Sequence, residues 1–111
     1  MNVTRFAKAP PYFPDNHFGM QCVRLQGHEA GPSQSLWLGV STIEPGGHTT
    51  LSGSRVEKHY VVLEGTVNVQ TDTGEVALER HDSCRLEPNE RRALHNRTQQ
   101  PALILLAMPY A

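Results

Sequence analysis

The chain has little cysteine, little excess of either charge and no long apolar run among its 111 residues. Its only two cysteines, Cys22 and Cys84, lie far apart in the sequence, so we expect reduced thiols in a cytoplasmic protein rather than a disulfide. The formal net charge of −1 gives no reason to expect nucleic acid or an anionic membrane as a partner. Because no long apolar run lies near the N-terminus, the sequence predicts neither a signal peptide nor a membrane span.

The length and composition favour a single domain preceded by an arm. One domain of this length can bury roughly two-thirds of its unfolded surface, and a hydrophobic content of 38% is adequate for one core. Residues 1–14 include three prolines, which interrupt helix and central strand alike. Because Phe6, Tyr12 and Phe13 add apolar side chains, we expect this arm to extend across its own domain or a partner subunit. Residues 15–111 are expected to form the domain itself.

Short runs of β-forming residues, separated by turn residues, fill the domain. The pattern predicts strands at residues 17–26, 36–43, 56–63, 66–70, 76–78, 84–87, 92–96 and 102–108. We expect turns at residues 45–47 and 71–74, and a hairpin that joins two paired strands at Glu64-Gly65. No segment has the pattern of a long helix, so the chain is all-β. The periodicity alone leaves a jelly roll, a lipocalin-like barrel and an immunoglobulin-like sandwich open.

Two segments carry a resemblance to a known family. Residues 45–47 (PGG) and 60–65 (YVVLEG) resemble the first conserved motif of the cupin superfamily. Residues 78–96 resemble the second motif, which here includes His81-Asp82, Pro88 and Asn96. The resemblance covers about half of the chain and implies a cupin-type jelly-roll barrel. Since dimers are common among small cupins, it also implies a homodimer.

The resemblance further implies that the usual metal ligands are missing. Metal-binding cupins carry His-x-His and Glu in the first motif and one His in the second. The matching positions here are Ser52, Ser54, Lys58 and Arg92, which are two hydroxyls and two cations. A divalent cation would meet like charge there, whereas a carboxylate or phosphate would meet hydrogen-bond donors. We therefore expect a pocket that binds an anionic small molecule and needs no cofactor.

Strand alternation extends this site to neighbouring residues, because side chains two positions apart lie on the same face. An inward Ser52 brings His48 inward as well. An inward Arg92 brings Asn96 inward and places His95 on the opposite face. Counting back from Gly65 directs Lys58 and Tyr60 into the barrel.

A shift of one residue along this strand would instead turn Glu57 and His59 inward. Both registers are open from the sequence. If Lys58 does turn inward, burial and the charge of Arg92 would lower its pKa. It would then be suited to proton transfer or to Schiff-base formation.

The candidate residues fall into three groups. The catalytic candidates are Lys58, Arg92 and His48. The ligand-binding candidates are Ser52, Ser54, Tyr60, Arg92 and Asn96. An alternative set of metal ligands for one divalent transition metal consists of His48, Glu57, His59 and His95, because imidazole and carboxylate suit such ions.

Three functions match these groups. The first is a metal-independent isomerase or lyase that acts on a carboxylate or phosphate compound. The second is a ligand-binding or sensory module without catalysis. The third is a metal-dependent, dioxygenase-like cupin that uses the alternative ligands. The family resemblance is common to all three functions, so it does not choose between them.

Overall fold

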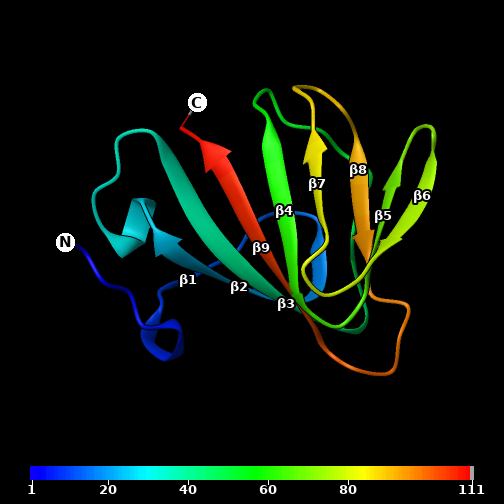
Figure 1. The fold of residues 1–111 in the computed structure, drawn as a ribbon, viewed down its shortest axis with the longest axis horizontal. Helices are drawn as coiled ribbons and strands as arrows, with labels where there is room; N and C mark the ends of the chain where they lie inside the picture. Colours follow the sequence, from blue (N-terminus) through cyan, green and yellow to red (C-terminus); the bar gives the residue numbers. More distant parts are fainter. Residues whose placement is uncertain (111) are drawn as a thin grey trace.

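Nine strands form one antiparallel sheet that curls into a nearly closed barrel in the computed structural model, which describes residues 1–110 (Figure 1). The strands are β1 (Pro11–Tyr12), β2 (His17–Gln26), β3 (Leu36–Thr49), β4 (Lys58–Glu64), β5 (Val67–Thr71), β6 (Gly74–Leu78), β7 (Ser83–Leu86), β8 (Arg92–His95) and β9 (Ala102–Pro109). The helical segments of the described residues are two single 3₁₀ turns, η1 (Phe6–Lys8) and η2 (His28–Ala30). The predicted all-β jelly roll is confirmed.

Strand β3 connects the two halves of the barrel. The strand order is β6-β5-β8-β3-β9-β4-β7, and β2 pairs with β1 and with β3 from Leu38 to Thr49. The first part of β3 pairs with β9, whereas its end pairs with β8 at His48 and His95. The edges β6 and β7 are not paired with each other in the described part of the chain, and a cavity of about 510 Å³ lies between them. The barrel is therefore open along one seam.

The turn predicted at residues 45–47 is wrong, because these residues lie within β3. The backbone of β2 approaches so closely that a Cβ atom on Gly47 would lie 2.5 Å from the Gly19 carbonyl oxygen. The β2–β3 register shifts at this point, between Phe18 and Met20. Gly46 adopts a φ of +80°, which glycine tolerates without strain. The glycines thus allow an irregularity inside one long strand rather than a reversal of the chain.

The hairpin predicted at Glu64-Gly65 is also wrong. Strand β4 lies between β9 and β7, whereas β5 lies between β8 and β6. Gly65, with a φ of +76°, redirects the chain from one half of the barrel to the other. A two-residue link looks like a hairpin in the sequence, but here it is a crossover. The hairpin predicted at residues 71–74 is confirmed, with Thr71 paired to Gly74.

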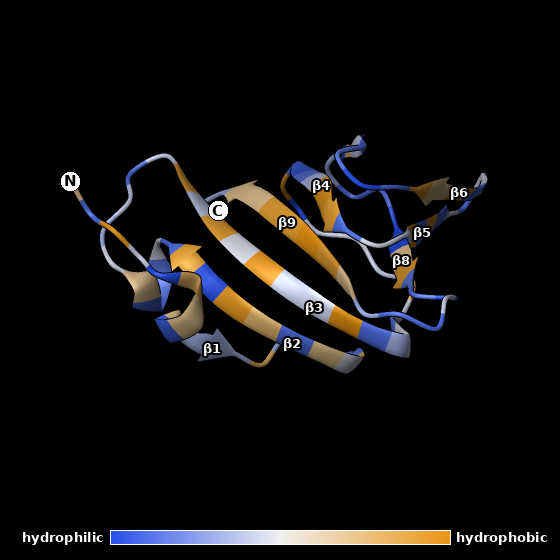
Figure 2. Ribbon diagram, turned by 60° about the horizontal axis from the view of Figure 1, so that its bottom comes forward, coloured by the Kyte–Doolittle hydropathy of each residue, from blue (hydrophilic) through white to orange (hydrophobic). Residues whose placement is uncertain are grey.

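Apolar residues recur along the strands (Figure 2), and apolar side chains from the strands form the core of the barrel. The core consists of Ile43, Tyr60, Val62, Val67, Val69, Leu78, Leu86, Leu94, Ala102 and Ile104. Ile43 and Val62 are completely buried, and full burial of such a side chain stabilises the fold by roughly 1.5–3 kcal/mol. The buried polar side chains of the described residues are Ser41, Thr49, Lys58, Arg92 and Asn96.

The N-terminal arm lies against its own barrel at β1. Residue Pro11 pairs with Val23 of β2, and the Arg24 amide donates to the Pro10 carbonyl at 2.9 Å. Phe13, in contrast, is 88% exposed. An exposed aromatic side chain in the arm is compatible with the expected homodimer, which stays a prediction that light scattering would check. No helix in residues 1–110 is long and apolar enough to cross a membrane.

Candidate functional site

A cluster of polar side chains lies inside the barrel where the apolar core ends. Lys58 and Tyr60 project inward from β4, and Arg92 projects inward from the start of β8; their exposed fractions are 8%, 2% and 4%. Of the two registers left open for β4, the structure has the one that buries Lys58. The alternation that places Tyr60 in the core therefore also brings a lysine to the edge of the core.

Hydrogen bonds hold the Arg92 guanidinium in place. Its Nε atom donates to the Tyr60 hydroxyl at 3.0 Å, and one terminal nitrogen donates to the Ser52 hydroxyl at 3.2 Å. Ser52 is itself fixed, because its backbone exchanges two hydrogen bonds of 3.0 Å with that of Arg92. Ser52, Tyr60 and Arg92 thus form one hydrogen-bonded group, which orients the guanidinium before any ligand binds.

Neither buried cation is paired with a carboxylate. The ion pairs among residues 1–110 join other side chains, and the buried residues of that range include no Asp or Glu. Lys58 also has no hydrogen-bond partner among the described residues. Because every fully buried side-chain nitrogen and oxygen there has such a partner, the Lys58 ammonium must retain contact with solvent. The Lys58 ammonium is therefore not sealed from water.

The electrostatics of this site follow from burial. Burial, together with the positive charge of Arg92, lowers the pKa of Lys58 from 10.5 to about 8. Burial raises the pKa of Tyr60, although Arg92 opposes that shift, so the phenol is neutral at physiological pH. The site thus combines a fixed cation, an amine that loses its proton near pH 8 and a neutral hydroxyl.

His17 belongs to the same site, although no role was assigned to it from the sequence. It pairs with Thr49 of β3, which is buried, so both side chains lie on the inner face. Burial lowers the pKa of His17, and the charges of Arg92 and Lys58 lower it further. The Nδ1 atom lies 2.7 Å from the carbonyl oxygen of Asp15, so Nδ1 carries the proton and the Nε2 lone pair is free.

A cavity of about 330 Å³ adjoins this site beneath the N-terminal arm. It is lined by Pro11, Tyr12, Phe13, Pro14, His17, Met20, Gln21, Cys22 and Val23. His17 therefore contributes to the wall of the cavity and to the surroundings of the two cations. The arm thereby supplies apolar and aromatic surface beside His17, whereas Lys58, Tyr60 and Arg92 do not line this cavity.

The predicted inward orientation of His48 is wrong. The His48 ring lies on the outer face, stacked on His95 with ring centroids 6.2 Å apart and on Phe18 at 5.1 Å. His48 and His95 were expected on opposite faces, but they are direct partners across β3 and β8. Strand β3 ends at Thr49, so counting back from Ser52 crossed a segment in which alternation does not hold.

Two other candidates have internal partners. The Ser54 hydroxyl donates to the Val56 carbonyl oxygen at 2.7 Å. The Asn96 amide nitrogen donates to the carbonyl oxygens of Ile43 and Gln100, and its oxygen accepts two hydrogen bonds from Thr98. These contacts leave the Asn96 side chain no free donor, which favours a role in connecting β3 to the loop after β8.

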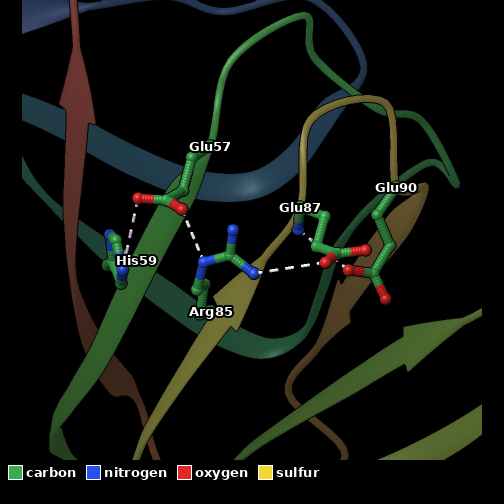
Figure 3. A network of polar contacts seen from close by, with 5 residues as sticks. All are labelled: Glu57, His59, Arg85, Glu87 and Glu90. Carbon is green, nitrogen blue, oxygen red and sulfur yellow. Dashed lines mark hydrogen bonds and ion pairs between the residues drawn. The ribbon is translucent and has the colours of Figure 1, made fainter.

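The alternative metal ligands do not come together. Glu57 and His59 lie on the outer side of β4, where the Glu57 carboxylate contacts the His59 ring at 3.6 Å and the Arg85 guanidinium (Figure 3). His48 and His95 form a separate pair on β3 and β8. Residues 1–110 contain no cluster of three or more His, Cys, Asp or Glu side chains arranged to hold a metal ion.

The usual ligand positions of the family do not suit a metal either. They hold Ser52, Ser54, Lys58 and Arg92, and two of these side chains are cations that would repel a divalent ion. We therefore derive no chemical step through a metal.

Comparison with known proteins establishes the family. The model described as "Cupin domain" matches residues 39–108, which is more than half of the chain. The chain belongs to the cupin family. It is 39% identical, over 110 residues, to the protein named Beta-D-galactosidase Rv1717 of Mycobacterium tuberculosis; this match covers 99% of the chain and 95% of the relative.

Solved structures show the same fold. The chain is similar to the polyketide cyclase RemF of Streptomyces resistomycificus, with a TM-score of 0.87, 16% identity and coverage of 98% of this chain and 79% of that one. It is also similar to a cupin-superfamily sugar phosphate isomerase of Silicibacter pomeroyi, with a TM-score of 0.74, 23% identity and coverage of 84% and 60%. At these identities the likeness concerns the fold alone.

Proposed function

We propose that this cupin binds a small carboxylate or phosphate compound between Lys58 and Arg92 and acts on it as a metal-independent isomerase or lyase. The observation that carries this proposal is the presence of two buried cations without a carboxylate partner in residues 1–110. Removing two like charges from water destabilises a protein unless an opposite charge compensates them. An anionic ligand would supply that charge.

The neighbouring groups favour proton transfer on the bound anion. Lys58 loses its proton near pH 8, and His17 has a free Nε2 lone pair when neutral, so either can act as a base. The Tyr60 phenol remains protonated and accepts a hydrogen bond from Arg92, which leaves its own proton free to donate. Because acid, base and anchor belong to one cluster of inward-facing side chains, the site fits isomerase or lyase chemistry better than binding alone.

A second candidate is glycoside hydrolysis, which the 39% identical relative named as a galactosidase favours. That reaction ordinarily uses a pair of carboxyl groups beside the glycosidic bond. No Asp or Glu is buried among residues 1–110, so the inner site lacks that pair. Incubation with p-nitrophenyl β-D-galactopyranoside would test this candidate directly.

Calorimetric titration with small carboxylates and inorganic phosphate, with and without chelator, tests the main proposal. A charge-assisted hydrogen bond contributes about 1.5–3 kcal/mol, so Arg92→Ala should weaken carboxylate binding roughly ten- to a hundredfold. Arg92→Lys should recover only part of this loss, because an ammonium cannot keep the contacts to Tyr60 and Ser52 while it binds the anion.

Arg91→Ala is the matched control, because Arg91 is exposed and paired with Asp72. It should bind as wild type does. Unchanged binding by Arg92→Ala, or loss of binding with chelator, would overturn the anion site. If binding is intact but no panel compound is converted, the chain is a ligand-binding module instead.

A further inference from the structure

We propose that the Lys58 amine forms a Schiff base with the carbonyl carbon of a 2-oxo carboxylic acid whose carboxylate is bound by Arg92. This inference rests on the proposed function and names the substrate class for the same site. It requires a nucleophilic amine, an anion anchor beside it and groups that can move protons. Each of these is present in the described residues.

Lys58 has the surroundings that a nucleophilic amine needs. It is 8% exposed, it has no carboxylate or hydrogen-bond partner in residues 1–110, and yet its ammonium must contact solvent. The burial that removes water also favours the uncharged amine, with a pKa of about 8, and only the uncharged form can attack a carbonyl. The other lysine of the chain, Lys8, is exposed at the end of η1 and lacks this environment.

Arg92 is suited to hold the carboxylate because part of its guanidinium remains free. Nε donates to the Tyr60 hydroxyl and Nη1 donates to Ser52, whereas Nη2 donates to no atom of residues 1–110. Since no fully buried side-chain nitrogen there lacks a partner, Nη2 contacts solvent. A carboxylate can take that place. In a 2-oxo acid the electrophilic carbon is bonded directly to the carboxylate. Binding of the carboxylate by Arg92 therefore presents the carbonyl carbon to the neighbouring amine.

The reaction balances without an oxidant or a reductant. The Lys58 Nζ lone pair adds to the carbonyl carbon, and a proton passes from nitrogen to the carbonyl oxygen to give a carbinolamine. Loss of the hydroxyl group with one proton, as water, forms the imine. Tyr60 can donate the proton to the departing oxygen, and His17 Nε2 can accept the proton that leaves nitrogen. Removal of a proton from C3 of the imine then gives an enamine. After the enamine is protonated again, hydrolysis of the imine releases the oxo acid and restores the Lys58 amine.

Reductive trapping tests the inference on the full-length chain. Pyruvate with sodium cyanoborohydride should add one reduced pyruvate to the protein, and peptide mapping should place it on Lys58. Lys58→Arg keeps the charge but removes the nucleophile, and should lose the adduct. Lys8→Arg, the matched control, should be labelled as wild type is.

Acetone separates the amine from the anchor, because it carries a carbonyl without a carboxylate. Arg92→Ala should lower the initial rate of pyruvate labelling by roughly tenfold or more, by analogy with the loss of one charge-assisted contact. It should slow acetone labelling less than pyruvate labelling, because acetone loses no anchor and is affected only by the higher pKa of Lys58 that follows from removing the Arg92 charge. Labelling confined to Lys8 or to the N-terminal amine of the wild type would overturn the inference. Peptide mapping of the labelled wild-type protein tests the inference even if Lys58→Arg fails to fold.

Lactate distinguishes failure of this inference from failure of the proposed function, because it has the carboxylate but no carbonyl. If lactate binds in an Arg92-dependent manner and pyruvate is not trapped at Lys58, the Schiff base is refuted and the anion site stands. If lactate and the rest of the carboxylate panel do not bind, the anion site is refuted, and the Schiff base with an anchored oxo acid is refuted with it.

Discussion

Arg92 and Tyr60 are joined by a hydrogen bond of 3.0 Å from Nε to the phenolic oxygen, which connects the start of β8 to the middle of β4. Tyr60 is also part of the apolar core. The orientation of the proposed anion anchor is therefore coupled to the packing of the barrel. The same strand positions Lys58 two residues away on the inner face.

Replacement of Tyr60 by Phe should reduce both stability and anion affinity. The change keeps the ring in the core but leaves the Arg92 Nε without its acceptor, and an unsatisfied buried donor costs about 1–3 kcal/mol. Urea unfolding would measure this loss. Tyr110→Phe is the control, since its hydroxyl accepts from the His28 amide at an exposed position where water can replace it. Equal losses in the two variants would contradict the buried role of Tyr60.

Replacement of Lys58 by Met should stabilise the free protein, most strongly near neutral pH. At pH 7 the buried amine is charged in the folded state, so removing it should raise the free energy of unfolding by on the order of 1–2 kcal/mol. This gain is smaller than the full pKa shift implies, because Lys58 retains contact with solvent.

The sign of the pH dependence follows from the lowered pKa of Lys58. Between pH 8 and 10.5 the unfolded chain binds more protons at this residue than the folded chain does. The contribution of Lys58 to the free energy of unfolding therefore rises with pH over this interval. The free energy of unfolding that Lys58→Met adds should therefore be smaller at pH 10 than at pH 7. An advantage that grows with pH would contradict the assigned direction.

Replacement of Asn96 by Ala should destabilise the fold without a specific effect on anion affinity. It removes the hydrogen bonds to Ile43, Thr98 and Gln100, and we expect a loss of about 3 kcal/mol in the free energy of unfolding. Asn68→Ala, which removes one exposed contact to Glu75, should cost about 0.5 kcal/mol. Unaltered stability with weakened anion binding would instead make Asn96 a ligand-binding residue.

Replacement of Gly65 by Ala should cost more stability than replacement of Gly46 by Ala. Both residues have a positive φ, +76° and +80°, so both variants carry the same backbone strain. A Cβ atom on Gly65 would also lie 3.0 Å from the Pro101 carbonyl oxygen, whereas one on Gly46 meets nothing within 4 Å. We expect an additional loss of about 1 kcal/mol or more for Gly65→Ala, measured by thermal unfolding. Equal losses would mean that the crossover is not tightly packed.

Local features of the sequence were sufficient for the fold class, but they left two registers open for the strand that carries Lys58. The strand segments could be recognised because β-forming residues and turn residues alternate over short distances, as at the hairpin of residues 71–74. The family resemblance favoured inward positions for Lys58 and Arg92 by their spacing to Gly65 and Pro88 in the two motifs. The structure buries both side chains and decides the register that the sequence left open at Glu57 and Lys58.

Strand pairing and the far wall of the site depended on the tertiary structure. The sequence could not show that β4 and β5 part at Gly65, because a hairpin and a crossover use the same two-residue link. It could not place His17 beside Lys58. Strands β3 and β9 lie between β2 and β4 in the sheet, so β2 and β4 contribute to one site only because of this long-range strand order. His48 was misplaced because alternation holds along a strand and ends at Thr49. Local chemistry thus determined which side chains could form a site, and long-range pairing decided which of them face one another.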